Sequence, residues 1–469
     1  MDEARVQEYV EKCKNLCSLS KDQSFMLEKV PAPFYPLDDY CAGSINNQKA
    51  SIFREVGVEM SMQPMIDDAG VTILAPKSRR IHREIVRLPG KIKELKDYGT
   101  CRREITARMA VHEKTLETIK QADYGNMSVT ESAAQFTKIC DFVASLAHDR
   151  FMYALFPSFF AVGKLKKAMK KVDSRLSEYD LYANLDYRTA LISRDMATMA
   201  GKIREDESLA QDLLSGMSYD RLLENHLAAS SIFEEFLKEN GYKLDFNCYC
   251  LYSSSYIENP DRLLNILRPL VGGQELLQED EHRFESICSD LKQVCNQAEY
   301  DRLMLDIDDF RYFHVMREES QYYWETAFYY GRQALRRLSL LLYGTEDYTD
   351  NLAYLFINEF RTIEKTGAVS QELQEKIDLR RANRPLAKQV WEECKLLVFG
   401  EASDELKGIS GSIGNATGPA RIIKSPKEFH KMQQGDVLVC QYTDPEWTPL
   451  FKLASAWWPT QEPSCPTLP

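Results

Sequence analysis

The sequence predicts a mainly helical protein that ends in a small domain containing β-strands. Three observations lead to this prediction. Apolar residues recur every three to four positions through much of residues 1–400, which is typical of amphipathic helices. Glycines become frequent after Gly400, and short β-branched runs begin there. A length of 469 residues is enough for two to four domains.

Two segments show the helical period most clearly. Residues 332–344 place three leucines on one face and three arginines largely away from it, and Gly344 is expected to end that helix. The leucines are Leu335, Leu338 and Leu342, and the arginines are Arg332, Arg336 and Arg337. Residues 219–243 predict a second helix that ends at Gly241. Its apolar stripe, which we expect to be core, consists of Leu222, Leu223, Leu227, Ile232, Phe236 and Leu237.

Two stretches interrupt the helical pattern. Residues 31–77 begin with PAPFYPLDD, whose three prolines are expected to break any helix. A short strand is predicted near Val71–Leu74. Residues 247–262 also read as irregular.

The composition of the chain and its sequence patterns argue against three classes of interaction: nucleic-acid binding, membrane insertion and metal binding. The formal net charge of −12 argues against a nucleic-acid partner, because such proteins need a basic face to neutralise phosphates. No apolar run can span a bilayer and the amino terminus lacks the pattern of a signal peptide, so we expect a cytoplasmic location and no membrane partner. The 12 cysteines show no CxxC spacing and the seven histidines no HExxH pattern, so we predict ordinary thiols and no metal site.

The segment from Lys407 onward contains turn signals and short strands. Strands are predicted at Ala420–Ile423 and in the run VLVC at 437–440, with a turn at residues 434–436 before the second. Ser425 and Thr448, each followed by a proline, are expected to cap short helices. The segment is therefore predicted to be a separate domain.

These residues resemble a known domain. GISGSIGNATGPARII followed by GDVLVCQYTDPEWTPLF is similar to the opening half of the swivelling phosphohistidine domain of pyruvate phosphate dikinases, phosphoenolpyruvate synthases and rifampin phosphotransferases. The motif residues are Gly411, Gly414, Thr443, Asp444, Pro445, Glu446, Trp447 and Thr448. The resemblance implies a domain that carries phosphate from ATP, bound in an ATP-grasp domain, to a small acceptor bound elsewhere.

The sequence departs from the family where the phosphate-carrying histidine is expected. In the family that histidine lies on a loop near a helix N-terminus, which favours a phosphate. Here WWPTQEPSCPTLP follows Ala456, and its four prolines are expected to exclude a strand followed by a helix. A shifted reading frame of the same codons can encode LSHAA, the family's histidine loop. We therefore expect a single-base slip near the codon of Ala456, with a genuine proline-rich tail as the alternative.

The resemblance thus implies three regions, and it implies that this chain lacks parts that the family's enzymes need for catalysis. A helical acceptor-type domain would span 1–400, the first half of the swivelling domain 405–456, and an aberrant tail 457–469. No transfer histidine, no P-loop and no ATP-grasp segment is recognised, so no catalytic residue and no cofactor are assigned to this chain. ATP and Mg²⁺ are implied for a full-length family member. We expect residues 405–469 to be poorly packed, with an open sheet edge and an uncovered apolar face.

The helical region shows a weaker likeness to the same family, from about residue 20 to residue 456. Segments such as Phe236–Phe246 and Arg317–Gly344 are similar to the helical region of rifampin phosphotransferase-like proteins, which binds the acceptor. By this resemblance Arg317 and Glu318 are candidate acceptor-site residues, and a solvated helical ion pair is the alternative. The aromatic residues between 322 and 330 could line an acceptor pocket or belong to the core.

Three functional hypotheses follow from the resemblance. The chain is a fragment of an ATP-dependent dikinase-type phosphotransferase, a non-catalytic acceptor-binding pseudoenzyme, or one half of a split enzyme whose ATP-grasp domain is a separate chain. The expected partners are a small-molecule phosphate acceptor and, in the split case, that ATP-grasp chain. Whether the chain is itself an enzyme is left open, and under all three hypotheses it is expected not to consume ATP alone.

Overall fold

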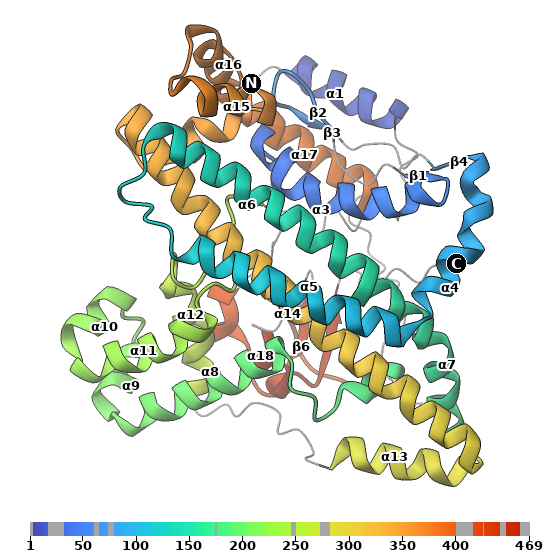
Figure 1. Ribbon diagram of the computed structural model, residues 1–469. Helices are drawn as coiled ribbons and strands as arrows, with labels where there is room; N and C mark the ends of the chain where they lie inside the picture. Colours follow the sequence, from blue (N-terminus) through green and yellow to red (C-terminus); the bar gives the residue numbers. More distant parts are fainter. Residues whose placement is uncertain are drawn as a thin grey trace. The chain divides into compact units, whose positions relative to one another are not determined.

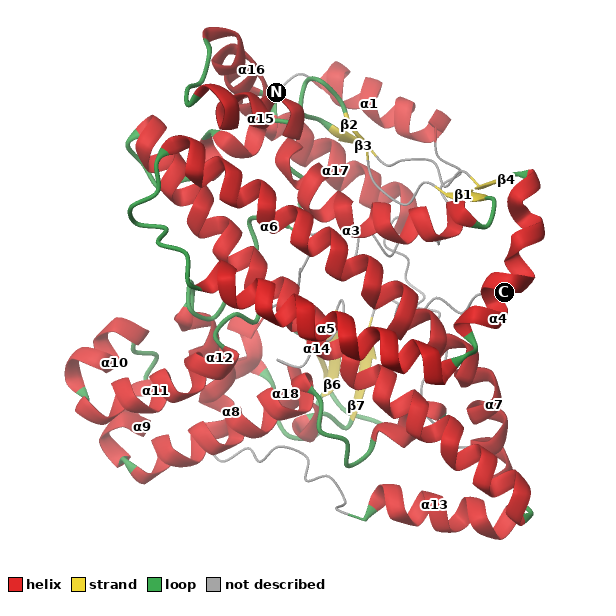
Figure 2. Ribbon diagram, in the orientation of Figure 1, coloured by secondary structure: helices red, strands yellow, loops and turns green. Residues whose placement is uncertain are grey.

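The computed structural model divides the chain into two units, and each has its own apolar core. Unit 1 comprises Met1–Pro157, Asn247–Ser253 and Tyr323–Glu405, and unit 2 comprises Ser158–Phe246, Ser254–Tyr322 and Leu406–Pro469. The structure describes residues 3–16, 32–60, 65–73, 79–173, 176–244, 250–272, 282–399, 416–424, 426–440 and 447–459. Helices make up most of these residues (Figure 2), and a small parallel sheet lies near the carboxyl end of the chain, which confirms the predicted fold class in outline.

Unit 1 is built from long helices. They are α1 (Glu3–Leu16), α3 (Pro36–Glu55), α4 (Leu88–Leu95), α5 (Tyr98–Lys120), α6 (Val129–Arg150), α15 (Ile357–Thr366), α16 (Gln371–Ala382) and α17 (Arg384–Phe399). Short helical turns are η2 (Arg83–Arg87), the π-helix η3 (Phe151–Leu155), η5 (Tyr348–Asp350) and η6 (Leu352–Tyr354). Two antiparallel strand pairs join β1 (Val58–Met60) to β4 (Arg79–Ile81) and β2 (Met65–Ile66) to β3 (Thr72–Ile73).

Helix α6 lies at the centre of unit 1. It begins with a capping box, in which Ser128 and Glu131 each accept a hydrogen bond from the other's backbone N–H. Phe136, Ile139 and Val143 recur at helical spacing and are fully buried. On this apolar face α6 packs against α3, α5 and α15 (Figure 1).

The stretch predicted to be free of helix contains one. Helix α3 starts at Pro36 and runs for 20 residues. The prediction from PAPFYPLDD was wrong because Pro36 occupies the first turn, where a proline has no intrahelical hydrogen bond to lose. The strand predicted near Val71–Leu74 is confirmed as β3, within the described residues.

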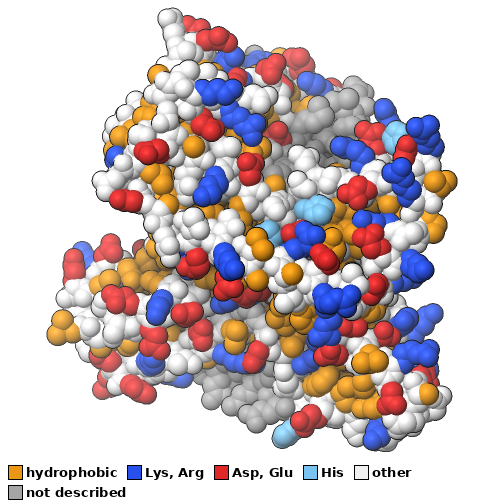
Figure 3. All heavy atoms as spheres, in the orientation of Figure 1, with side chains coloured by type: hydrophobic (Ala, Val, Ile, Leu, Met, Phe, Trp, Pro, Cys, Tyr) orange, Lys and Arg blue, Asp and Glu red, His pale blue; other side chains and the backbone are white. Residues whose placement is uncertain are grey.

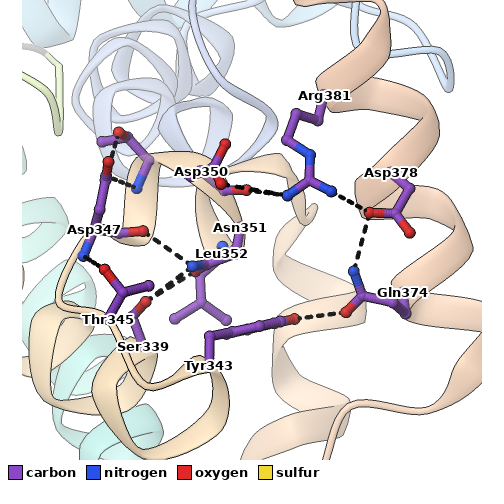
Figure 4. A network of polar contacts seen from close by, with 11 residues as sticks. Ser339, Tyr343, Thr345, Asp347, Asp350, Asn351, Leu352, Gln374, Asp378 and Arg381 are labelled. Carbon is purple, nitrogen blue, oxygen red and sulfur yellow. Dashed lines mark hydrogen bonds and ion pairs between the residues drawn. The ribbon is translucent and has the colours of Figure 1, made fainter.

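The long helix α14 spans Gln297–Tyr343. The turn that follows it lies in unit 1, and Asn351 organises this turn (Figure 4). The Asn351 amide donates to the Ser339 hydroxyl and to the Asp347 carbonyl, both at 3.0 Å, and its Oδ1 accepts from the Leu352 N–H at 2.6 Å. Asn351 is buried, so water cannot reach its partners, and the Asn351 side chain makes their hydrogen bonds instead. One polar side chain therefore fixes the course of the backbone here.

The carboxyl end of α14 lies within residues 332–344, for which a leucine face and a helix end at Gly344 were predicted. The helix ends at Tyr343 and Gly344 takes a φ of +72°, as predicted. Leu335 and Leu338 are fully buried. Arg332 was expected to lie largely away from the leucine face, and it is nevertheless buried, at 1% exposed. Most residues of α14 from 324 to 339 are buried, so the helix is covered on more sides than a two-faced pattern anticipates.

Unit 2 contains shorter helices. They are most of α7 (Phe156–Val172), η4 (Glu178–Tyr182), α8 (Arg188–Glu205), α9 (Glu207–Leu214), α10 (Tyr219–Asn225), α11 (Leu227–Asn240), α12 (Pro260–Val271), α13 (Arg283–Val294) and the first part of α14, to Tyr322. Helices α8, α11 and α12 pack against one another around a core of leucine, isoleucine, phenylalanine and methionine side chains.

The single helix predicted over residues 219–243 is two helices. The backbone leaves the helical conformation at His226, with φ −129° and ψ 108°, so α11 starts in a new phase. Leu227 is consequently 99% exposed, and its assignment to the core was wrong. Leu222 and Phe236 are buried as predicted, and Gly241 caps α11.

The carboxyl-terminal part of unit 2 is a three-stranded parallel sheet in the order β5-β6-β7. Along the chain it runs β5 (Ala420–Ile422), the 3-10 helix η7 (Pro426–Lys431), β6 (Val437–Cys440), α18 (Thr448–Leu453) and β7 (Ala456–Pro459). The two predicted strands are confirmed as β5 and β6. Ser425 lies outside the described residues, and Thr448 is the first residue of α18, with Trp447 in the N-cap position.

Two features of this part were not predicted. Residues 456–459 form a strand, because the aromatic side chains of Trp457 and Trp458 suit a pleated edge and Pro459 comes last, where it breaks little of the ladder. The residues after Pro459 lie outside the described part of the chain, so the expected absence of a strand followed by a helix stays a prediction. The described part of 405–469 is also packed around its own core. That core consists of Ile423, Phe429, Met432, Leu438, Cys440, Trp447 and Leu450.

The expected open edge and exposed apolar face are present in the described residues. Strand β7 lies at one edge of the sheet. The parallel register puts Ile422, Val439 and Trp458 on one face. Ile422 is 62% exposed and Trp458 39% exposed, so this face carries apolar side chains in contact with solvent.

Gly418 makes a close backbone contact that we predict no other residue tolerates. A Cβ atom at this position would lie 2.1 Å from the Gly435 carbonyl oxygen. Gly418→Ala is therefore expected to destabilise the β5–β7 sheet by about 1–3 kcal/mol, the usual range for overpacking. Hydrogen exchange of the Val437 amide, which donates to the Pro419 carbonyl, would report the loss.

Gly163→Ala, in helix α7, is the matched control for Gly418→Ala. No atom lies within 4 Å of a Cβ added at Gly163, and alanine favours the helix. This variant should leave protection of the sheet unchanged. Equal protection in Gly418→Ala would contradict the prediction.

Candidate functional site on helix α14

The two candidate acceptor-site residues lie side by side in the unit 2 part of α14. Arg317 donates from Nε and Nη2 to one carboxylate oxygen of Glu318, at 3.2 and 2.9 Å. The other oxygen of Glu318 accepts from the Thr189 hydroxyl at 2.8 Å. The Arg317 side chain remains 33% exposed, whereas Glu318 is 15% exposed. The pair is thus anchored to α8 through Glu318, and the guanidinium can still reach solvent.

Six residues before Arg317 on the same helix, Arg311 holds the loop between η4 and α8. Its guanidinium donates to the carbonyls of Leu181, Ala183 and Asn184 at 2.5, 2.8 and 3.3 Å. Asn184 has a φ of +55°, and its side chain accepts from the Phe284 N–H at 3.0 Å. These bonds fix residues 181–184 against α14.

His314 lies between the two arginines and packs against this loop. Its ring stacks on Tyr182 with centroids 3.7 Å apart and meets the edge of Tyr187 at 4.5 Å. The side chain is 5% exposed, and neither ring nitrogen has a hydrogen-bond partner among the described residues. Burial lowers the pKa of His314 to about 4, with a further lowering by Arg317, so the imidazole is neutral at pH 7.

A second ion pair borders the same surface. Arg188, the first residue of α8, donates to both carboxylate oxygens of Glu319 at 2.8–3.2 Å. Its guanidinium also lies over the Tyr322 ring at 4.2 Å. This bidentate geometry keeps Arg188 engaged within the protein.

Four functional groups lie in this part of α14 and α8. Arg317 supplies a partly exposed guanidinium and His314 a buried neutral imidazole. Thr189 supplies a hydroxyl, and Glu318 a carboxylate whose charge is partly balanced by Arg317. An exposed guanidinium can form charge-assisted hydrogen bonds with a carboxylate or phosphate. The Arg317 side chain is held by Glu318 and stays partly in contact with solvent. We call Arg317, Glu318, His314 and Thr189 the α14 cluster.

A cavity of about 650 Å³ lies elsewhere in unit 2. It is lined by the end of α7, η4 and α13, and its charged residues are Asp173, Asp180, Asp290 and Arg283. Arg283 contacts Asp180 at 3.4 Å. The carboxylates outnumber the arginine, so this cavity does not suit an anionic ligand.

Two of the six aromatic residues in 322–330 belong to the core. Trp324 and Phe328 are buried in unit 1, and the Arg150 guanidinium lies 4.4 Å from the Trp324 ring centroid. The four tyrosines, Tyr322, Tyr323, Tyr329 and Tyr330, are partly exposed, and Tyr330 stacks on Tyr124 at 5.5 Å. Core packing therefore describes Trp324 and Phe328, and the pocket interpretation stays a prediction for the tyrosines.

Unit 1 contains another polar cluster that the sequence pattern did not indicate. The Asp149 carboxylate contacts His112 at 2.8 Å, Arg108 at 3.0 Å and His148 at 3.2 Å, immediately before the π-helix η3. Burial alone would raise the pKa of Asp149, but these three neighbours hold it well below its usual range. The carboxylate is therefore ionised and well paired, as expected of a structural ion cluster.

Most of the swivelling-domain motif lies outside the described residues. This applies to Gly411, Gly414, Thr443, Asp444, Pro445 and Glu446. Trp447 is described and buried, with its ring 5.1 Å from that of Phe429. Its role in the described structure is packing between η7 and α18.

Four residues at this site were not predicted from the sequence: His314, Tyr182, Tyr187 and Thr189. His314 could have been found, since it lies three residues before Arg317 and so occupies the same side of the helix. The other three come from η4, the following loop and α8, more than 100 residues away in the chain. No periodic signal links them to α14.

Two general properties concern the described residues as a whole. No helix among them combines the length and apolar composition of a membrane span. No three or more histidine, cysteine, aspartate or glutamate side chains in this part of the chain are arranged to hold a metal ion. On the face shown in Figure 3, acidic and basic side chains are interspersed.

Comparison with known proteins gives short matches to one group of enzymes. The chain is 53% identical over 49 residues to YvkC, an uncharacterized phosphotransferase of Bacillus subtilis, and this covers 10% of the chain and 6% of YvkC. It is 40% identical over 68 residues to phosphoenolpyruvate synthase of Escherichia coli, covering 14% of the chain and 8% of the synthase. A probable phosphoenolpyruvate synthase of Archaeoglobus fulgidus is 35% identical over 78 residues.

No protein-family model matches the chain. The matched segments span 6–10% of the length of these three relatives, so their activities as whole proteins do not transfer with the match. The likeness that the sequence suggests over residues 20–456 stays a prediction over most of its length. Within the matched segments, this chain is related to the phosphoenolpyruvate-utilising phosphotransferases.

Proposed function

We propose that this chain is part of an ATP-dependent phosphotransferase of the phosphoenolpyruvate synthase or rifampin phosphotransferase type. In this proposal the β5–β7 sheet is part of a swivelling phosphohistidine domain. The helical region binds a small phosphate acceptor, and the α14 cluster contributes to that site. By itself the chain does not turn over ATP.

One observation carries the proposal more than any other. The predicted strands of the motif segment form adjacent parallel strands, with η7 and α18 as the connections. This strand-helix alternation around a small core is what a compact carrier domain requires. The short matches to phosphoenolpyruvate synthases support the same family.

ATP and Mg²⁺ belong to the proposed reaction, but the described side chains do not fit a site for them. Mg²⁺ is usually held by carboxylates together with substrate phosphates, and no group of three or more histidine, cysteine, aspartate or glutamate side chains in the described ranges is arranged to hold a metal ion. We therefore assign nucleotide binding to an ATP-grasp domain on another segment or another chain.

The purified chain is expected to form no AMP from ATP. The measurement is chromatographic quantification of AMP after incubation with ATP and Mg²⁺, with and without pyruvate. Size-exclusion fractions control for contaminating activity, because the activity of a contaminant would not follow the elution profile of the chain. Turnover that scales with the amount of homogeneous protein would contradict the proposal.

Acceptor binding is expected to depend on Arg317. Pyruvate and phosphoenolpyruvate are the probes, since both carry a carboxylate that a guanidinium can bind. Arg317→Gln should weaken binding about tenfold or more, which corresponds to loss of one charge-assisted hydrogen bond. Isothermal titration calorimetry measures the change.

Arg302→Gln is the control for Arg317→Gln, because Arg302 is an exposed arginine on the same helix. Equal weakening in both variants would indicate a general charge effect and would remove the α14 cluster from the proposal. No binding of either probe to the unmodified chain would exclude both compounds as acceptors.

A further inference from the structure

Two cysteines from opposite ends of the helical region lie in contact in unit 1. The Sγ atoms of Cys13 and Cys394 are 3.3 Å apart, although the residues are separated by 381 positions in the sequence. Cys13 belongs to α1 and Cys394 to α17, and these helices pack directly on one another. Both residues are thiols in this structure.

The packing of α1 against α17 holds the two sulfurs in register. Val6, Val10 and Cys13 recur at helical spacing along α1, and all are buried in one apolar cluster. Ala387, Val390, Trp391 and Cys394 face them from α17 in the same cluster. Polar bonds outside the cluster also fix α1, because the Tyr9 hydroxyl donates to Asp67 at 2.6 Å and Arg5 donates to Asn383 at 3.3 Å.

We propose that Cys13 and Cys394 form an oxidation-sensitive thiol pair, which closes to a disulfide and fastens α1 to α17. A disulfide has an S–S bond of about 2.05 Å, so the sulfurs must approach by roughly 1.3 Å. Two packed helices can supply that movement through side-chain rotation and a small shift. The site is separate from the α14 cluster, which is in unit 2.

Hydrogen peroxide is the oxidant in this proposal. One thiolate attacks a peroxide oxygen, the O–O bond breaks, and the products are a sulfenic acid and one water molecule. The second thiol then attacks the sulfenic sulfur, an S–S bond forms, and a second water molecule leaves. One peroxide is reduced to two water molecules, and two thiols are oxidised to one disulfide.

Burial determines how the pair reacts. Both sulfurs belong to fully buried residues, so peroxide reaches them only when α1 separates locally from α17. The reaction is therefore slower than oxidation of a partly exposed cysteine such as Cys288. Once closed, the disulfide links two elements distant in sequence and restricts the unfolded chain, which raises the stability of unit 1.

The test uses the full chain treated with hydrogen peroxide, quenched with catalase and alkylated under denaturing, non-reducing conditions. Peptide mass spectrometry is expected to find a peptide that joins Cys13 to Cys394, lighter than the two reduced peptides together by two hydrogen atoms. Dithiothreitol should abolish it. The thermal unfolding midpoint should rise by a few degrees on oxidation and return on reduction.

Three variants make the result specific. Cys13→Ser and Cys394→Ser should each lose both the joined peptide and the rise in the midpoint. Cys250→Ser should keep both, since Cys250 is a third buried cysteine of the same cluster and is not required for the link. The proposal is overturned if Cys13 and Cys394 are still fully alkylated when peroxide treatment is extended well beyond complete oxidation of Cys288, or if either is recovered as sulfinic acid without the link.

Discussion

Replacing Arg380 by leucine is expected to lower the free energy of unfolding of unit 1 by about 3–5 kcal/mol, because it breaks a buried ion pair. Arg380 is almost fully buried and donates to both carboxylate oxygens of Glu359, at 2.5 and 3.0 Å. It also donates to the carbonyls of Asp68 at 3.0 Å and Tyr354 at 2.8 Å. The substitution removes the arginine donor from the Glu359 carboxylate and from both carbonyls, and leaves Glu359 with the Phe356 N–H at 3.0 Å and Lys376 at 3.5 Å.

The cost should appear in elements far from Arg380 in sequence. Its guanidinium joins α16 to α15 and to the turn before β3, so the loss should reach all three. Gly70 lies against the same side chain, because a Cβ there would be 3.0 Å from the Cβ of Arg380. Urea unfolding followed by circular dichroism would measure the change, and hydrogen exchange would localise it.

Arg381→Leu is the matched control, one residue further along α16. Arg381 is 41% exposed and contacts Asp378 and Asp350 at 2.6 and 3.4 Å (Figure 4). Exposed pairs contribute about 0–1 kcal/mol, so this variant should unfold at nearly the same urea concentration as the unmodified chain. Similar losses of unfolding free energy in the two variants would show that burial of the Arg380 ion pair does not increase its contribution to stability.

The second large effect is a dependence of unit 1 stability on pH through Asp38. This carboxylate is fully buried at the start of α3 and accepts from the Leu251 N–H at 2.7 Å and the Tyr35 N–H at 2.9 Å. Burial raises the pKa of Asp38 from 3.8 to about 6, although the two backbone donors and Arg384 oppose the rise. The folded protein therefore binds a proton at Asp38 more tightly than the unfolded chain does.

The sign of the effect follows from this order of pKa values. The stabilising contribution of Asp38 is fully present below pH 3.8 and is lost as the pH rises through about 6. The span corresponds to about 3 kcal/mol at about 1.4 kcal/mol per pH unit. The Asp38→Asn variant cannot ionise at this position and lacks the contribution.

The measurement is the difference in unfolding free energy between the unmodified chain and Asp38→Asn, from pH 4 to pH 7. The unmodified chain should gain about 3 kcal/mol relative to the variant toward the acid end. Asp141→Asn, at an exposed carboxylate of α6, controls for the loss of one negative charge. A difference that stays constant with pH, or grows toward pH 7, would contradict the assignment.

Two of the three strands of the carboxyl-terminal sheet, β5 and β6, could be predicted from the sequence. They are short runs that contain β-branched residues and lie next to turn residues, and such signals depend only on neighbours in the chain. Gly435 in the turn takes a φ of +88°, as a glycine at that position suggests. Strand β7 contains no β-branched residue and was not predicted.

The sequence by itself determined the helical class, the positions of two of the three parallel strands and the relation to phosphoenolpyruvate-utilising enzymes. These rest on periodicity and on contiguous motifs, and both are properties of nearby residues. Only the tertiary structure decided that Arg332 is buried, that Thr189 binds Glu318 and that Cys13 meets Cys394. Each of these contacts joins or covers segments distant in sequence. Burial depends on what the rest of the chain places around a residue, which no local pattern encodes.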